Sequence, residues 1–195
     1  MRETYDIDFF RSIIKNADSY YAHLPNEGNN NKPETLAEHS SLVVRYAQKL
    51  CRMHNLHPVI SQLIESSIPQ TLEQRSVMVE MVHELFWQSI AFHDFGKVNR
   101  KFQTSRMKHS STDMLKVEHD FEHHHAIISV YIFLALYFKR LMKCHFSNEH
   151  NEMEFVSNIA LYLSYPMYKH HASALNECQK NDNWDRVDMF SLRPY

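Results

Sequence analysis

Apolar residues recur every three or four positions along most of the chain, which is the spacing of one face of an α-helix. A first helix is therefore predicted over residues 6–23, with an apolar face made of Ile7, Phe10, Ile14, Ala17 and Tyr21. A second helix is predicted over residues 34–53, where Pro33 suits the start, and its apolar face consists of Leu36, Val43, Ala47 and Leu50.

The middle of the chain predicts a long helix that ends beside a glycine. Thr71 is a candidate cap for its start, and the helix should end near Phe95. Gly96 then occupies a C-terminal cap position, where glycine adopts positive φ without strain. The apolar stripe of this helix includes Val82, Leu85 and Phe86.

Two more helices are predicted in the last third of the chain. Residues 118–142 are very apolar, and residues 153–165 form a periodic segment that Pro166 should end. Residues 103–116 have no sustained apolar face, which indicates a loop. Helices without a convincing strand indicate an all-α fold.

Length and composition fit one folded domain. The chain has 195 residues, of which 44% are hydrophobic, and it shows no internal repeat. We expect a single helical domain over residues 1–180 and a tail or linker over residues 181–195. Only two residues are glycine, so the phosphate-binding pattern G-x-x-x-x-G-K-[ST] cannot be built here.

Charge and cysteine content restrict the setting of the protein. The net charge is −2 with histidine neutral, which by itself indicates no particular partner. The cysteines Cys51, Cys144 and Cys178 are few and widely separated, as in a reducing compartment, so we expect a cytoplasmic protein. No signal peptide is recognisable, and the apolar residues 126–138 are too few to span a bilayer, so no membrane association is expected.

The chain is rich in histidine, with 15 residues of a type that often binds metals. His39 lies on the apolar side of its predicted helix, and an imidazole near a carboxylate suits a divalent cation. Taken singly, each histidine also fits an ordinary core or surface position. Four places stand out as possible contributors to one site: His39, His93-Asp94, His125 with Ser129 four residues later, and His170-His171.

Together, these pieces resemble the HD superfamily of metal-dependent phosphohydrolases. Within it they are most similar to the nuclease domain of the CRISPR-associated type I interference nuclease–helicase. The chain matches that family's order with a lone His39, H-D-x-G-K at residues 93–97, H-x-x-x-S at residues 125–129 and the tandem His170-His171. The resemblance covers residues 36–175, and H-D-x-G-K with a tandem His-His is its most specific part.

The resemblance implies a single helical domain with a two-ion site between core helices, in which Asp94 bridges the ions. The first ion would be held by His39, His93 and Asp94. The second ion would be held by Asp94, His125, His170 and His171.

The chain departs from the family pattern at two places. The family often has glutamate after the third-motif histidine, where this chain has Ala126, so His124 is a further candidate there. The family also places a late aspartate on the first metal, for which Asp188 is the candidate in this chain.

The resemblance also implies an activity: a metal-dependent endo- or exodeoxyribonuclease that hydrolyses single-stranded DNA in CRISPR interference, an antiviral defence. Lys97 would neutralise charge that develops on the phosphate, and Arg100 and Lys101 would bind nucleic acid. Nitrogen-rich ligation favours manganese, iron, cobalt or nickel over magnesium. The implied partners are single-stranded DNA, an ATP-dependent helicase domain or chain, and an RNA-guided CRISPR surveillance complex.

Two other functions fit the same residues. An HD-type phosphohydrolase acting on a nucleotide or cyclic dinucleotide needs similar metal chemistry. A non-catalytic helical module that binds a partner is the second alternative.

Overall fold

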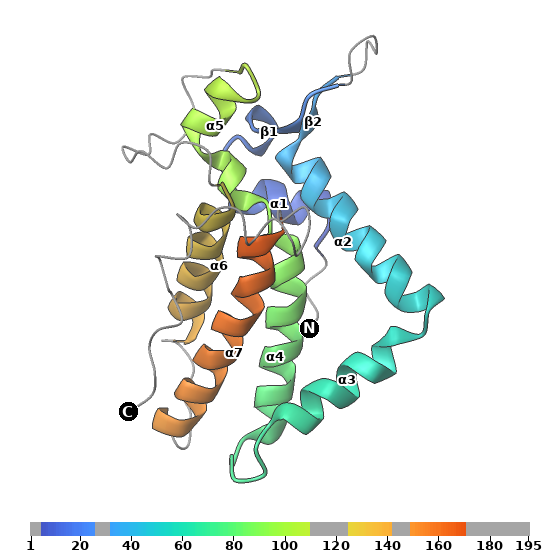
Figure 1. The fold of residues 1–195 in the computed structure, drawn as a ribbon, viewed down its shortest axis with the longest axis vertical. Helices are drawn as coiled ribbons and strands as arrows, with labels where there is room; N and C mark the ends of the chain where they lie inside the picture. Colours follow the sequence, from blue (N-terminus) through green and yellow to red (C-terminus); the bar gives the residue numbers. More distant parts are fainter. Residues whose placement is uncertain (1–4, 26–31, 110–124, 142–148, 171–195) are drawn as a thin grey trace, which may run out of the picture.

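The computed structural model describes residues 5–25, 32–109, 125–141 and 149–170. The protein is all-α, as predicted: the described residues form seven α-helices, two short 3₁₀-helices and one two-stranded sheet. Figure 1 shows the sheet and the short helix α5 (Arg100–Ser105) gathered at one end of the longer helices.

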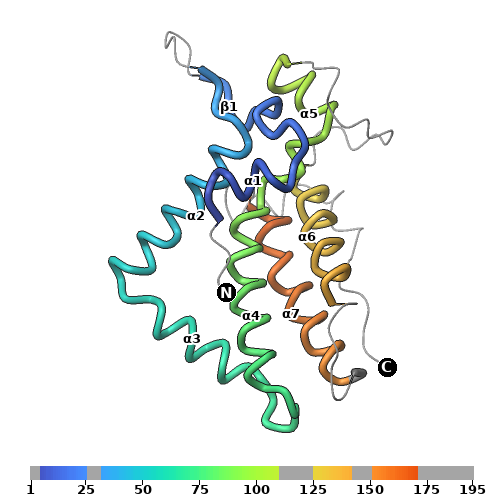
Figure 2. Tube along the Cα trace, turned by 180° about the vertical axis from the view of Figure 1, so that it is seen from behind, coloured from blue at the N-terminus to red at the C-terminus, as the bar shows by residue number. Residues whose placement is uncertain are grey.

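Three long helices lie side by side and form the main packing unit: α4 (Arg75–Ala91), α6 (His125–Leu141) and α7 (Glu149–Lys169). The end of α4, the start of α6 and the end of α7 meet at the same end of this bundle (Figures 1 and 2). Fully buried side chains such as Met78 and Phe133 fill the space between them. The bundle therefore brings three sequence-distant helix ends together.

The apolar face of α6 is buried against this bundle, with Phe133 and Tyr137 almost completely covered. Its opposite side exposes Tyr131 and Phe138. Of the predicted helix over residues 118–142, residues 125–141 are helical and residues 118–124 lie outside the described residues. None of the helices in the described part of the chain has both the length and the apolar character that a membrane crossing requires.

Helices α2 (Leu36–Met53) and α3 (Leu56–Ser67) extend away from the bundle and back again, as a V (Figure 1). A reciprocal capping box of Thr35 and Glu38 fixes the start of α2. The predicted helix over residues 34–53 is confirmed, but its predicted apolar face is partly wrong.

The buried side of α2 is displaced from the predicted one. Within the predicted face Leu36 is buried, but Val43 and Ala47 are half-buried and Leu50 is 53% exposed, whereas Val44, outside that face, is buried. The far half of α2 projects away from the bundle (Figure 1), although Cys51 in its last turn is buried. An apolar stripe on a projecting helix therefore overstates what that helix buries.

The helix predicted over residues 6–23 is wrong beyond its first two turns. Helix α1 covers Ile7–Ile13, and Asn16 then adopts a left-handed conformation with φ 57°. A 3₁₀-turn (η1, Ala17–Ser19) leads into strand β1 (Tyr21–His23), which pairs antiparallel with β2 (Glu34–Thr35). Helix α1 ends before Ile14, whose backbone is extended, and the left-handed Asn16 then redirects the chain, so the later apolar residues of this segment pack from a turn and a strand.

Helix α1 is fixed to the end of α4 by aromatic contacts. The ring of Phe10 lies 6.4 Å from that of Phe92 and 5.6 Å from that of Phe95, measured between centroids. Figure 2 shows α1 crossing this end of the bundle. The sequence just after α4 is thus covered by apolar rings from the start of the chain.

The predicted limits of α4 and α7 also need correction. Helix α4 begins at Arg75 and not at Thr71, and the backbone N–H of Gln74 donates to Glu152 Oε1 on α7 at 3.1 Å. Helix α7 does not end before Pro166 but continues to Lys169. Proline removes one backbone donor from a helix interior, and the packing of α7 against α4 and α6 outweighs that loss.

The segment predicted as a loop over residues 103–116 begins inside α5. Gln103 is fully buried, accepts from the backbone N–H of Tyr21 at 3.0 Å and donates to the Tyr21 carbonyl at 2.9 Å. The Gln103 side chain thus pairs with both backbone groups of Tyr21 in β1, as the backbone of a neighbouring strand would. Residues 110–116 of the predicted loop lie outside the described residues.

Gly96 allows two backbone segments to meet. It lies in a 3₁₀-turn (η2, Phe95–Val98) without positive φ, so the expected cap conformation is wrong. A Cβ at this position would stand 1.8 Å from the carbonyl oxygen of His125 and 2.8 Å from the backbone nitrogen of Ser129. Glycine is required here because η2 touches the first turn of α6.

Replacing Gly96 with alanine should therefore destabilise the protein, because the added methyl group overlaps backbone that cannot move alone. We expect Gly96→Ala to lower the free energy of unfolding of the metal-free protein by roughly 2–4 kcal/mol, measured by urea denaturation. Ala135→Ser on the exposed side of α6 is the control and should change it by less than about 0.5 kcal/mol. Equal stability of the two variants would contradict this account of η2.

Candidate metal centre

The side chain of Asp94 lies at the centre of a group of histidines at the converging helix ends. Asp94 lies three residues beyond the end of α4, immediately before η2, and is 4% exposed. His39 reaches it from the second turn of α2, His125 from the first residue of α6 and His170 from just beyond α7. Together with His93, these are the described members of the ligand set predicted from the sequence, and the structure brings them together.

The four imidazoles divide evenly between the two oxygens of the Asp94 carboxylate. Oδ2 lies 3.1 Å from His39 Nε2 and 3.5 Å from His93 Nε2. Oδ1 lies 3.2 Å from His125 Nε2 and 2.9 Å from His170 Nε2. Asp94 is therefore shared by two groups of three potential metal ligands, one on each oxygen.

The far nitrogens of three of these rings are held by acceptors. His93 Nδ1 lies 2.9 Å from the carbonyl oxygen of Ile90, His170 Nδ1 contacts the carbonyl oxygen of Met167, and His39 Nδ1 lies 3.3 Å from Glu34 Oε2. A carbonyl or carboxylate oxygen only accepts hydrogen bonds, so each Nδ1 would carry the ring proton when an ion is bound at Nε2.

A neutral ring with its proton on Nδ1 has a lone pair on Nε2. In His39, His93 and His170 that lone pair faces a carboxylate oxygen, which is also electron-rich. Such an arrangement is favourable when a cation lies between the two atoms. The donor set of imidazole nitrogens around one buried carboxylate therefore fits divalent transition metals.

The pKa values of the centre favour the protonation states that metal ligands need. Burial by itself would raise the pKa of Asp94, but the surrounding imidazoles of His125, His170 and His39 hold that pKa well below its usual range. Burial lowers the pKa of His93, and this outweighs the opposing influence of Asp94 and the Ile90 carbonyl. An ionised carboxylate beside a neutral imidazole is the ligand-competent combination.

Lys97 lies beneath the carboxylate and not on the protein surface. It is 3% exposed, and its Nζ lies 2.8 Å from Asp94 Oδ2 and 3.2 Å from the carbonyl oxygen of Ala22, to which it donates. The Phe102 ring covers its other side, with the centroid 5.9 Å from Nζ. The charge of this ammonium is therefore directed at Asp94.

A short hydrogen-bonded path connects the two sequence motifs that meet here. The backbone N–H of Gly96 donates to Ser129 Oγ at 2.8 Å, and this hydroxyl donates to the carbonyl oxygen of His125 at 2.9 Å. The serine four residues after His125 thus ties the start of α6 to η2. The spacing H-x-x-x-S has this physical purpose.

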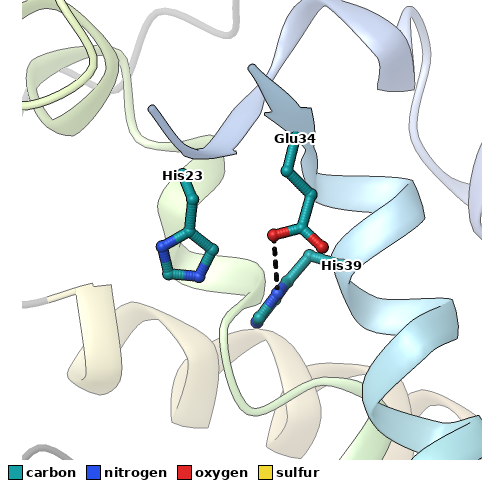
Figure 3. Close-up of side chains that lie close together, drawn as sticks. All are labelled: His23, Glu34 and His39. Atoms are coloured by element: carbon teal, nitrogen blue, oxygen red, sulfur yellow. Dashed lines mark hydrogen bonds and ion pairs between the residues drawn. The ribbon is translucent and has the colours of Figure 1, made fainter. Parts of the chain in front are cut away.

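Sequence reasoning missed two residues beside the centre, His23 and Glu34. The pairing of β1 with β2 places them opposite each other, and both lie next to the ring of His39 (Figure 3). Burial, together with Lys97 and His39, lowers the pKa of His23. The only sequence signal was the position of Glu34 just ahead of a capping box, because the β1 segment was predicted as helix.

Several predicted residues stay untested by the geometry. His124, His171 and Asp188 lie outside the described residues. Arg100 is exposed and Lys101 half-buried in the first turn of α5, directly after η2. Their nucleic-acid role stays a prediction.

Comparison with known families gives a match over most of the chain. Residues 24–190 match the family described as "Cas3, HD domain". Comparisons with curated proteins and with solved structures gave no match. The matched range includes every described residue that contacts the Asp94 carboxylate.

The depressed pKa of His93 predicts that acid destabilises the metal-free protein. The unfolded chain takes up a proton at this residue below pH about 6.5, the ordinary histidine value, whereas the folded protein resists it. Stability from this group is therefore present above that pH and decreases as the pH falls, by at most about 1.4 kcal/mol per pH unit.

Urea denaturation between pH 5 and pH 8 measures this dependence. His93→Gln should flatten the slope, whereas His54→Gln, which removes an exposed imidazole, should leave the slope unchanged. If wild type and His93→Gln have the same slope, His93 is not the residue responsible.

Proposed function

The chain belongs to the family of Cas3 HD domains, which are metal-dependent nucleases of CRISPR interference, and on that basis we propose that it hydrolyses the phosphodiester backbone of single-stranded DNA. One observation supports this most: a single buried carboxylate with two imidazole nitrogens facing each of its oxygens. An isolated core histidine or a surface cluster would not arrange itself in this way.

Two divalent ions would be held by the two ligand groups. His39 and His93 would share one ion with Oδ2 of Asp94, and His125 and His170 would share the other with Oδ1. Nitrogen-rich ligation favours manganese, iron, cobalt or nickel over magnesium. When bound, such ions lower the pKa of water and stabilise charge on the attacking and leaving oxygens of a phosphodiester.

The protein's own residues keep the site ready for this chemistry. Without metal, the imidazoles of His125, His170 and His39 hydrogen-bond to Asp94 and keep it ionised. With ions bound, the acceptors at Nδ1 of three rings would keep the ring protons there and leave the Nε2 lone pairs for the ions. The buried walls fix these side chains before any substrate arrives, so little reorganisation is needed during reaction.

Lys97 acts through Asp94 in this proposal. The family resemblance predicts that Lys97 neutralises charge on the phosphate, but its Nζ contacts Asp94 and the Ala22 carbonyl and is buried. It would then balance the carboxylate's charge and hold Oδ2 in place. This makes it a positioning residue.

Family membership supports the substrate and partners in this proposal. Arg100 and Lys101, in the first turn after η2, would contact the DNA backbone by charge. A helicase domain or chain would supply the single strand, and an RNA-guided CRISPR complex in the cytoplasm would recruit it.

Removing the shared carboxylate should abolish DNA cleavage. We expect Asp94→Asn to lower cleavage of circular single-stranded DNA with Mn²⁺ by on the order of 100-fold or more, because both ion positions lose a charged ligand. Asp8→Asn, which removes an exposed carboxylate of α1, is the control and should cleave normally. Nucleotides and cyclic dinucleotides assayed alongside decide the substrate class.

Each result of that assay has a defined meaning. Hydrolysis of a nucleotide or cyclic dinucleotide with DNA left intact would assign the protein to the alternative phosphohydrolase class. Purified protein that binds neither Mn²⁺ nor Co²⁺ would support a non-catalytic module and overturn the nuclease proposal.

Replacing Lys97 with methionine separates its two possible roles. A positioning role predicts that Lys97→Met destabilises the metal-free protein by about 3 kcal/mol, because a buried charge loses its partner, and that Mn²⁺ recovers part of the loss. Thermal melting with and without Mn²⁺ measures both effects. Unchanged stability and metal affinity with lost cleavage would instead indicate direct contact with the phosphate.

A further inference from the structure

His39 is held differently from His93 and His170. In His93 and His170, Nδ1 faces a backbone carbonyl three residues earlier, within the ring's own turn. In His39, Nδ1 faces the Glu34 carboxylate, 3.3 Å away, which belongs to strand β2. A charged side chain from another element therefore sets the orientation of this ring.

The position of Glu34 is built into the start of α2. Its strand pairs with β1, and the next residue, Thr35, begins the capping box with Glu38. The carboxylate of Glu34 then folds back over the first turn of α2 onto the ring of His39 (Figure 3). Both side chains are partly covered, 29% exposed for Glu34 and 15% for His39, so water screens the interaction only in part.

We propose that Glu34 is a positioning residue that selects the metal-binding tautomer of His39. The inference rests on the proposed function, in which His39 is a ligand of the ion at Asp94 Oδ2. An ionised carboxylate only accepts hydrogen bonds, and His39 faces one at each nitrogen, Glu34 at Nδ1 and Asp94 at Nε2. When an ion lies beside Asp94 Oδ2, Glu34 accepts the ring proton at Nδ1 and leaves the Nε2 lone pair for the ion. Its negative charge also makes the imidazole a stronger donor.

The same residues suggest a competing possibility, an additional metal site. His23, Glu34 and His39 each offer a ligand atom within 4.8 Å of the others. A neutral imidazole, however, has one lone pair, so His39 cannot use Nδ1 for one ion and Nε2 for another. The ring of His23 meets that of His39 edge-on, with centroids 4.7 Å apart, and lies beside the pair of Glu34 and His39 (Figure 3).

Metal titration of the full chain tests the proposal. Isothermal titration with Mn²⁺ and the visible absorption of bound Co²⁺ measure affinity and number of ions independently of cleavage. Glu34→Ala should weaken binding about 10- to 100-fold, and Glu34→Gln by about 3- to 10-fold, because its amide oxygen still accepts from Nδ1. Glu38→Gln is the matched control: it removes the same charge nearby, preserves the capping box and should bind as wild type.

A second readout reports the tautomer of His39 in the presence of a diamagnetic ion, Zn²⁺. Nitrogen NMR of the histidine rings reports which nitrogen carries the proton, and comparison with His39→Asn assigns the signals of residue 39. Wild type and Glu38→Gln should show His39 protonated on Nδ1. Glu34→Ala should shift the population toward the tautomer protonated on Nε2.

The results that overturn the proposal are distinct from failure of the proposed function. Wild type that binds no ion refutes the metal centre itself. Wild type that binds, with Glu34→Ala matching Glu38→Gln in affinity and tautomer, refutes only the role of Glu34. Should Glu34→Ala not fold, Glu34→Gln decides on the same criteria. Loss of one ion per chain in both Glu34→Gln and His23→Ala would assign the additional site instead.

Discussion

The structure depends on one ionised carboxylate kept away from water. Asp94 is stable in that state because four imidazoles and the Lys97 ammonium surround it at 2.8–3.5 Å. A buried charge without such partners would cost several kcal/mol, so the helices that carry the partners are positioned around it. The converging ends of α4, α6 and α7, the strand pair and α1 all lie at the end of the bundle that contains this carboxylate.

Backbone packing sets the precision of the centre as much as its charged groups do. The absence of a side chain at residue 96 lets η2 touch α6, and Ser129 converts that contact into a hydrogen-bonded link to the His125 carbonyl. The aspartate and the histidine of two separate motifs are thereby held by the same few backbone atoms. A metal ligand set gains its rigidity from such outer contacts.

Helical periodicity predicted the fold class, and the resemblance to a family with the same motif order predicted that His39, His93, Asp94, His125 and His170 converge. The sequence-based predictions were wrong where tertiary contacts outweigh the local preference of a segment. Pro166 ends a helix by its own chemistry, yet packing carries α7 through it and so delivers His170 to the site. The strand β1 is held by Gln103, a residue 82 positions away, which no local pattern reveals. Glu34 escaped notice for the same reason: its partner His39 was evident, but the turn that joins them was not.

Helix α7 continues through Pro166 and carries His170 to Asp94, so the centre forms only when distant parts of the chain meet. His170 meets Asp94 across a separation of 76 residues, and η2 is joined to the first strand over a comparable distance, 75 residues from Ala22 to Lys97. Closing such long loops costs chain entropy that is recovered only when the whole bundle has packed. An unfolded or half-folded chain thus presents scattered imidazoles with weak affinity for ions, and tight capture of a metal becomes a late event that reports completion of folding.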